Sequence, residues 1–261
     1  MSATTATSGH QAPRPSVIVE AKCAAWLGLA SALAFAMAFP YFLAMLPKLA
    51  SAKLPLGILV PVGALQTGGV AFGLAWAGLW FGGQLGLTMP FLRAAVMREH
   101  LRAPSHLLAA AAAGATVATL GALLDKYLLL PLQPDAIRLA GAAIAPWKGL
   151  MSSFYGGIVE EIQIRLFLMS ALALVLRKFA RLRVDTAIVI AIVLAALLFG
   201  LGHLPAAAQM ARLSSIVVFR VVLLNMIVGL VCGVFFWRWG LEHAMLAHFA
   251  ADIVFHVAFA G

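Results

Sequence analysis

The chain has 261 residues, of which 64% are hydrophobic and 10% charged, and its formal net charge is +9. A soluble globular domain is about half apolar and a quarter charged, so this chain has too few charged side chains to cover a surface in water. The composition excludes a soluble enzyme, a disordered chain and a nucleic-acid-binding domain, in spite of the positive charge. It predicts an all-α polytopic bundle of transmembrane helices, because lipid requires apolar spans of about 20 residues.

The length is sufficient for one membrane domain. Residues 1–22 are mostly small and polar and predict a mobile N-terminal tail. Residues 23–261 are then a single transmembrane domain. The two cysteines, Cys23 and Cys232, lie in separate apolar stretches and indicate neither a disulfide framework nor a thiolate metal site.

The apolar stretches predict seven or eight membrane spans, of which seven can be delimited. Pro40 could bend the first span, and Asp125 and Lys126 in the third are expected to pair with each other or with lipid headgroups. Arg220 in the sixth span is expected to extend to the outer interface. The basic segment 90–105 is expected to lie at the membrane surface. The seven spans are 23–46, 62–88, 106–131, 150–177, 185–204, 213–238 and 241–260.

The distribution of basic residues between the loops predicts the orientation of the bundle. With the N-terminus inside, the inner segments contain ten Lys and Arg residues and the outer segments five. The sequence therefore predicts a cytoplasmic N-terminus. Topology and anionic lipid account for the net charge, and no nucleic-acid partner is needed. The outer residues are Lys48, Lys53, Arg138, Lys148 and Arg212, and the inner ones are Arg14, Lys22, Arg93, Arg98, Arg102, Arg177, Lys178, Arg181, Arg183 and Arg238.

Two adjacent carboxylates lie within the fourth predicted span, where ionisable groups are costly and usually functional. Glu161 and Arg165 are four residues apart and can pair on one face of the helix. Glu160 is rotated by about 100° from Glu161 and can face a different partner. A single carboxylate–arginine pair would be read as a structural ion pair, but two adjacent carboxylates favour acid–base chemistry.

The remaining polar residues that could carry chemistry lie in the fifth and seventh spans. His203 ends the fifth span, and by itself is more simply a polar residue at a helix end. His248 and Asp252 are one turn apart in the seventh span, so they can share a metal, or the carboxylate can orient the imidazole. A hydrogen-bonding stripe is the alternative for this pair.

Taken together, the pattern Glu-Glu-x-x-x-Arg, then Phe-x-x-x-His, then His-x-x-x-Asp, each in its own span, resembles the CPBP family of intramembrane proteases. That family is named for CAAX proteases and bacteriocin-processing enzymes and is also called the Abi family. The resemblance covers roughly residues 145–260, the predicted catalytic core within the C-terminal four helices. The family ends its third motif in Asn or Asp, and only an Asp can bind a cation or take up a proton. The matching residues are Glu160, Glu161, Arg165, Phe199, His203, His248 and Asp252.

The resemblance implies an intramembrane endopeptidase that cleaves a membrane-associated peptide or protein, which could be lipidated. Glu160 is expected to activate water, and His203 and His248 to hold a divalent metal, most simply Zn²⁺. Glu161 either completes the metal shell or is held by Arg165 as a support. Asp252 is a third ligand or orients His248. The predicted metal-binding set is His203, His248, Glu160 and Asp252. Without a metal, the two histidines would donate hydrogen bonds to the oxyanion.

A shared site requires these residues to reach a similar depth. If the lipid boundary lies near Ser170 and Ile190, Glu160 and His203 are ~15–20 Å deep, against ~12 Å for His248 and ~18 Å for Asp252, at 1.5 Å per residue. The site would then lie near mid-membrane in a water-accessible cavity, and the family resemblance suggests that it opens to the cytoplasm. The high alanine content favours a prokaryotic inner membrane.

Three alternatives remain at the level of sequence. A proton-coupled transporter would also use buried Glu, Arg, His and Asp, but its polar residues should occur in both halves of the chain. A catalytically silent immunity or scaffolding protein of the same fold is a second alternative. Haem bound between His203 and His248 is a third, and it would leave the two glutamates unexplained. The oligomeric state and the substrate cannot be read from the sequence.

Overall fold

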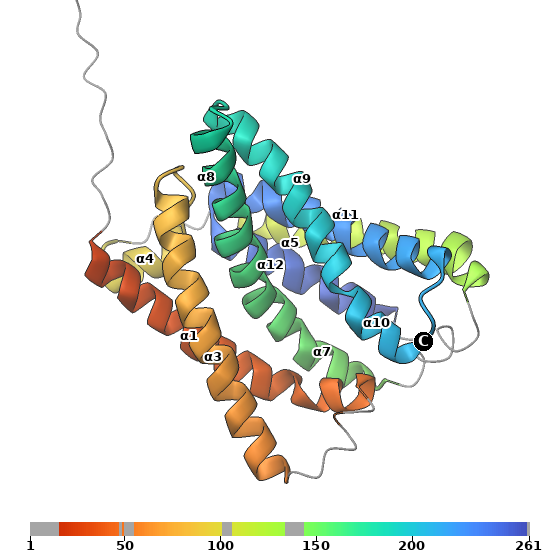
Figure 1. The fold of residues 1–261 in the computed structure, drawn as a ribbon. Coiled ribbons are helices and arrows are strands. Elements are labelled where there is room, and N and C mark those ends of the chain that lie inside the picture. Colours follow the sequence, from red (N-terminus) through yellow and green to blue (C-terminus); the bar gives the residue numbers. More distant parts are fainter. Residues whose placement is uncertain (1–15, 47–48, 50–54, 101–105, 134–143, 260–261) are drawn as a thin grey trace, which may run out of the picture.

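The computed structural model describes residues 16–46, 49, 55–100, 106–133 and 144–259. This part of the chain is a bundle of helices without a strand (Figure 1). Five helical stretches are long and apolar enough to cross a membrane: 17–45, 56–83, 107–132, 184–210 and 215–239. The chain is therefore an integral membrane protein with a polytopic all-α fold, as its composition predicts.

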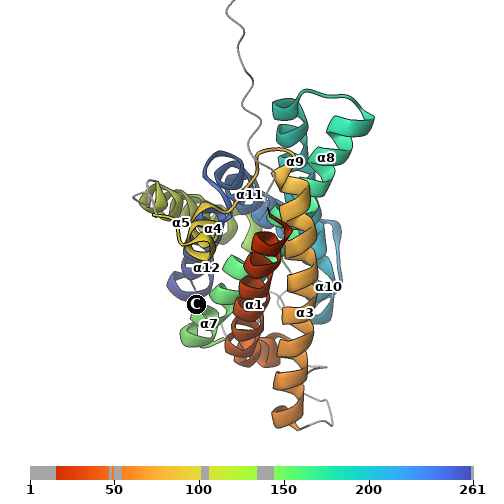
Figure 2. The ribbon, with the colours of Figure 1, turned by 90° about the vertical axis from the view of Figure 1, so that its left-hand side faces the viewer.

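The first two helices form an antiparallel pair. α1 (Val17–Met45) and α3 (Leu56–Gly83) cross in Figure 1 and lie side by side in Figure 2. They meet at two glycines: a Cβ added to Gly28 would lie 2.9 Å from the carbonyl oxygen of Gly68, and a Cβ on Gly68 would lie equally close to the oxygen of Gly28. Small residues of this kind let membrane helices approach to backbone contact.

Both helices differ from their predicted bounds. α1 begins at Val17, so residues 17–22 are helical rather than part of a tail, and residues 1–15 lie outside the described part. The second predicted span, 62–88, is wrong at both ends. Pro61 lies inside α3, where the early turns of a helix lose little from its missing N–H. The helix ends before Gly86, whose φ of +76° turns the chain in the left-handed region.

A short helix follows in the segment that was expected at the membrane surface. α4 (Pro90–Met97) begins with a proline, which suits the first helical turn. The Glu242 side chain accepts hydrogen bonds from the backbone N–H groups of Phe91 and Leu92, both at 2.9 Å. A carboxylate is favourable there because it pairs with free N–H groups at the positive end of the helix. Glu242 lies in the first turn of the last helix, so α4 is tied to the start of that helix.

α5 (Leu107–Leu124) continues through a π-helical turn, η1 (Asp125–Leu129), and a short 3₁₀ turn, η2 (Leu130–Leu132). Asp125 does not pair with Lys126. That pairing was predicted wrongly, because Asp125 and Arg220 bind each other, with Nε–Oδ1 at 2.5 Å and Nη2–Oδ2 at 2.6 Å. The sequence gives no indication of which helices become neighbours, and here a partner 95 residues away satisfies both charges.

The helix with the two glutamates lies at the centre of the bundle. It runs without a break from Pro146 to Phe179 as α7 (Pro146–Phe154), η3 (Tyr155–Glu160), η4 (Ile162–Met169) and α8 (Ser170–Phe179). It contacts α1 and α3 on one side. Its other neighbours are α9 (Val184–Gly202), α11 (Ser215–Trp239) and α12 (Leu241–Ile253). This placement removes the glutamates from lipid and surrounds them with the helices of the other motifs.

The end of the chain completes the wall around this helix. α9 is followed by the short α10 (Leu204–Met210), so His203 lies at the junction of two helices. α12 continues as η5 (Val254–Ala258) and packs against α5. A Cβ added to Gly114 of α5 would collide with the backbone of Ala247, so only a glycine permits this contact. The close packing fixes the position of α12, which carries His248 and Asp252.

Candidate active site

The first motif forms a buried ion pair within one helix. Glu161 and Arg165 are 0% and 1% exposed, and Nη1 of Arg165 lies 3.0 Å from Oε1 of Glu161. The predicted i, i+4 pair is therefore present. The surrounding stretch is π-helical, with hydrogen bonds between residues five apart, and such turns occur often at functional sites.

The same carboxylate oxygen also binds the third motif. Oε1 of Glu161 lies 2.7 Å from Nδ1 of His248, a side chain that is 4% exposed. An ionised carboxylate can only accept, so the imidazole N–H donates. Oε2 of Glu161 is buried and has no hydrogen-bond partner among the described residues. Glu161 therefore joins Arg165 on its own helix to His248 on α12 and keeps one oxygen free.

The other nitrogen of His248 faces two more carboxylates. Its Nε2 lies 3.8 Å from Oε2 of Glu160 and 3.6 Å from Oδ1 of Asp252. These distances exceed those of direct hydrogen bonds. An imidazole nitrogen without a proton would turn its lone pair toward both oxygens, and the negative charges repel that lone pair. The arrangement therefore calls for a proton, a water or a cation at Nε2.

Glu160 and Asp252 are less buried than the ion pair beneath them, at 23% and 14% exposure. Glu160 and Glu161 were expected to face different partners, but both lie beside His248, one at each ring nitrogen, and only Glu161 also pairs with Arg165. Asp252 lies one turn from His248 on α12, as their spacing predicted. The close approach of the two helices depends on Gly156, because a Cβ there would collide with Oδ2 of Asp252 and lie 3.3 Å from Nε2 of His248.

Phe199 connects the second motif to the other two. The centre of its ring lies 4.8 Å from the guanidinium carbon of Arg165, 4.7 Å from the ring of His203 and 5.5 Å from the ring of His248. The first contact is a cation–π interaction in a site without bulk water. Phe199 thus contacts one residue of each motif: Arg165 of the first, His203 of the second and His248 of the third.

His203 is oriented by its own helix. Its Nδ1 lies 2.8 Å from the backbone oxygen of Phe199, so Nδ1 donates and Nε2 is left as an acceptor. Among the described residues, His203 forms no hydrogen bond or ion pair with Glu160, His248 or Asp252. The structure therefore brings five of the six predicted residues into one contact network and links His203 to them through the Phe199 ring.

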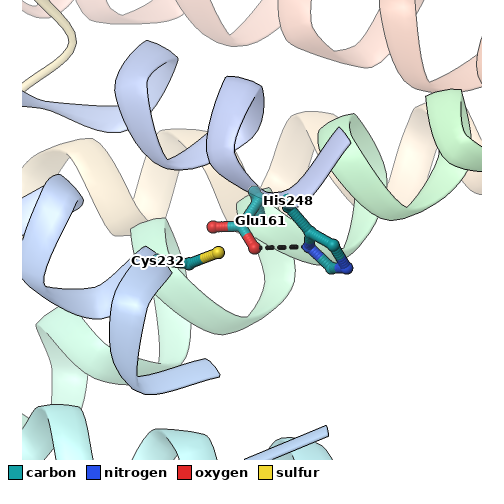
Figure 3. A group of neighbouring side chains, drawn as sticks. All are labelled: Glu161, Cys232 and His248. Carbon is teal, nitrogen blue, oxygen red and sulfur yellow. Dashed lines mark hydrogen bonds and ion pairs between the residues drawn. The ribbon is translucent and has the colours of Figure 1, made fainter. Parts of the chain in front are cut away.

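One residue near the site was not anticipated from the sequence. The thiol of Cys232, on α11, is fully buried, and Glu161, Cys232 and His248 each offer a ligand atom within 4.8 Å of the others (Figure 3). The hydrogen bond between Glu161 and His248 already uses two of these atoms. A cysteine in an apolar helix gives no sign of its neighbours. The adjacent small residues Gly156 and Gly157 are the feature of the sequence from which close helix packing beside the glutamates could have been inferred.

The general class of the protein is an all-α membrane bundle in which carboxylates and histidines lie buried where the helices meet. The comparison with family models is more specific. Residues 142–254 match the family described as type II CAAX prenyl endopeptidase Rce1-like. The match covers the segment that carries all three motifs, and it confirms the resemblance to CPBP intramembrane proteases there. No match was found among curated proteins or among solved structures.

Proposed function

We propose that this protein hydrolyses a peptide bond of a membrane-associated peptide or protein, with Glu160 as the general base. The observation that carries the proposal is the position of His248. Glu161 holds one of its nitrogens at 2.7 Å, and the other faces Glu160 and Asp252. An imidazole fixed in this way is the arrangement that general acid–base and metal-assisted hydrolysis both require.

Each residue has a role that follows from its contacts. Glu160 is the more exposed of the two glutamates, so it can reach a water and take its proton. Glu161 and Arg165 keep His248 in one tautomer and one orientation. Phe199 supports Arg165 and both imidazoles. In the absence of a metal, His203 and His248 in their protonated forms would donate hydrogen bonds from Nε2 to the oxyanion that forms at the scissile carbonyl.

The residues also suit a divalent metal, most simply zinc. Two atoms bound tetrahedrally to one zinc lie roughly 3.3–3.6 Å apart. Nε2 of His248 is 3.6 Å from Asp252 and 3.8 Å from Glu160, and Glu161 supplies the second carboxylate behind the imidazole. We propose His248, Asp252 and His203 as ligands, which leaves the fourth position open for water beside Glu160, the base. The chemistry that such an ion supplies when bound is a more acidic water and a polarised carbonyl.

A mostly apolar cavity in the structure is compatible with a lipid chain on the substrate. A cavity of about 610 Å³ lies between the end of α9 and the start of α11. Apart from Ser214 and Ser215, every side chain that lines it is apolar, and one of these is Leu201, two residues before His203. The family description names prenyl endopeptidases. We propose a lipidated peptide as substrate. The distribution of basic residues supports a cytoplasmic N-terminus, and the high alanine content supports a prokaryotic inner membrane.

The proposal is tested with a fluorescent, farnesylated peptide that ends in a CAAX sequence. The purified protein should cleave it, and mass spectrometry should locate the broken bond. Glu160→Gln should reduce cleavage by at least about 100-fold, because the amide cannot take a proton from water. Glu99→Gln is the matched control, since Glu99 is exposed and distant from His248 in the sequence. Both variants should unfold at the temperature of the unmodified protein. Retained activity in Glu160→Gln would remove Glu160 from its assigned role.

The metal is tested separately by elemental analysis of detergent-purified protein prepared without chelators. We expect about one zinc per chain, and its loss in a folded His203→Ala/His248→Ala variant. Activity should fall on treatment with a chelator and return with zinc. A metal-free protein that is fully active would contradict the metal and favour the hydrogen-bonding role of the histidines.

A further inference from the structure

A second cavity lies between α1, α3 and the helix that carries Glu160 and Glu161. Its volume is about 280 Å³. Three of its lining side chains carry an amide or hydroxyl group, Gln66 and Thr67 on α3 and Gln163 on η4, and Tyr155 adds a phenol. The remaining lining residues are Phe35, Gly63 and Val70.

The polar groups are unusual for their helices. α3 runs through the apolar sequence LGILVPVGALQTGGVAFGLAWAGLWFGG, in which Gln66 and Thr67 are the only amide and hydroxyl side chains. Both line the cavity. None of the side chains of Gln66, Thr67, Gln163 and Tyr155 forms a hydrogen bond with another residue in the part of the chain that the structure describes. Gln66 is exposed and the other three side chains are half-buried. Polar groups that face the interior of a membrane without partners are costly, so a polar occupant of the cavity would stabilise these side chains.

The cavity adjoins the proposed general base. Tyr155 precedes Glu160 by five residues in a π-helical stretch, which places the two one above the other. Gln163 follows Glu160 by three residues, close to one further turn. The cavity therefore lies along the helical segment that carries Glu160, and Glu160 itself is not one of the residues that line it.

The size and chemistry of the cavity favour a peptide. One water occupies about 30 Å³ of liquid, so a cavity of about 280 Å³ holds much more than the attacking water. A side-chain amide offers both a donor and an acceptor, and it can pair with the C=O and N–H of a peptide. A polypeptide that enters the membrane region without its own secondary structure needs such partners.

We propose that this cavity binds the backbone of the substrate peptide next to the scissile bond, with Gln66 and Gln163 as the pairing side chains. The inference rests on the proposed endopeptidase function and adds a peptide-binding subsite to it. The subsite recognises the main chain, so it would contribute affinity with little dependence on the side chains of the substrate.

The test uses Gln66→Leu, Gln163→Leu and the double variant. Gln84→Leu is the matched control, since Gln84 ends the same helix α3, is exposed, and donates only to the backbone oxygen of Trp80. Cleavage of the farnesylated CAAX peptide gives kcat and KM. The dissociation constant of the same peptide is measured on the Glu160→Gln background, where cleavage cannot interfere. Thermal unfolding identifies the variants that remain folded, and the single variants suffice if the double variant does not fold.

We expect KM and the dissociation constant to rise about tenfold for each lost pair of hydrogen bonds, with kcat changed less than about threefold. Gln84→Leu should leave both constants unchanged. An unchanged dissociation constant, or no binding of the peptide to the Glu160→Gln protein, would overturn the inference. A fall in kcat at constant KM would also overturn it and assign the cavity to water entry. If the unmodified protein binds the peptide without cleaving it, the proposed function fails. The dissociation constants of the Gln66 and Gln163 variants then still show whether the cavity binds the peptide.

Discussion

Two carboxylate–arginine pairs lie in the part of the helical bundle that the structure describes, and they differ in how completely their polar atoms are matched. Asp125 and Arg220 form a bidentate pair, with two short contacts between two nitrogens and two oxygens. In the pair of Glu161 and Arg165, one oxygen is shared with His248 and the other has no partner among the described residues. The first pair is also more exposed, at 15% and 22%, against 0% and 1% for the second.

This difference separates a structural role from a chemical one. A bidentate pair satisfies both partners and leaves no atom to act on a third group. In the second pair, Glu161 also binds Nδ1 of His248. Nε2 of the same imidazole faces Glu160 and Asp252. An incompletely matched polar network is costly in a buried site, so its presence needs a functional reason. We therefore assign the pair at Asp125 to the attachment of α11 to η1, and the pair at Glu161 to the active site.

The sharpest way to separate the pairs is to remove the arginine from each. Arg165→Met should lower the free energy of unfolding by about 3–5 kcal/mol, because Glu161 is left as an uncompensated charge in a fully buried site. Arg220→Met should cost less, since water and headgroups can reach the exposed part of Asp125. Denaturation in detergent gives both values. Equal losses would contradict the difference in burial on which the comparison depends.

A smaller effect is expected when the packing around His248 is disturbed without any change in charge. Gly156→Ala adds a methyl group that collides with Asp252, so it should cost about 1–3 kcal/mol of stability and most of the activity. Gly73→Ala is the matched control, because a Cβ at Gly73 meets no atom within 4 Å. That change should stabilise the helix by roughly 0.5–1 kcal/mol. Full activity in Gly156→Ala would show that the position of Asp252 is not critical.

The sequence alone was sufficient for the interactions within one helix. The spacing of Glu161 and Arg165, and of His248 and Asp252, predicted pairs that the structure contains, because residues four apart share a helix face. The long apolar stretches likewise predicted the helices, with errors at their ends. α1 begins at Val17, before the apolar stretch, and α3 continues through Pro61.

Contacts between helices could not be predicted in this way. The bonds from Glu161 to His248 and from Asp125 to Arg220 join residues far apart in the sequence, and hydrophobic patterns do not fix which helix faces which. Composition gave no sign of Cys232 beside the site, or of a shared ring contact through Phe199. The resemblance to a protease family was the reason to place the three motifs in one site. The depth of each motif along its helix agreed with a shared site but did not require it.

The most direct test of the account compares one residue of each network in the same cleavage assay. His248→Gln should reduce hydrolysis of the farnesylated CAAX peptide by about 100-fold or more while the protein remains folded, because the imidazole is lost. Asp125→Asn/Arg220→Gln should lower the unfolding temperature and retain most of the activity below it. An active His248→Gln protein, or a folded but inactive Asp125→Asn/Arg220→Gln protein, would contradict the assignment of chemistry to the network around His248.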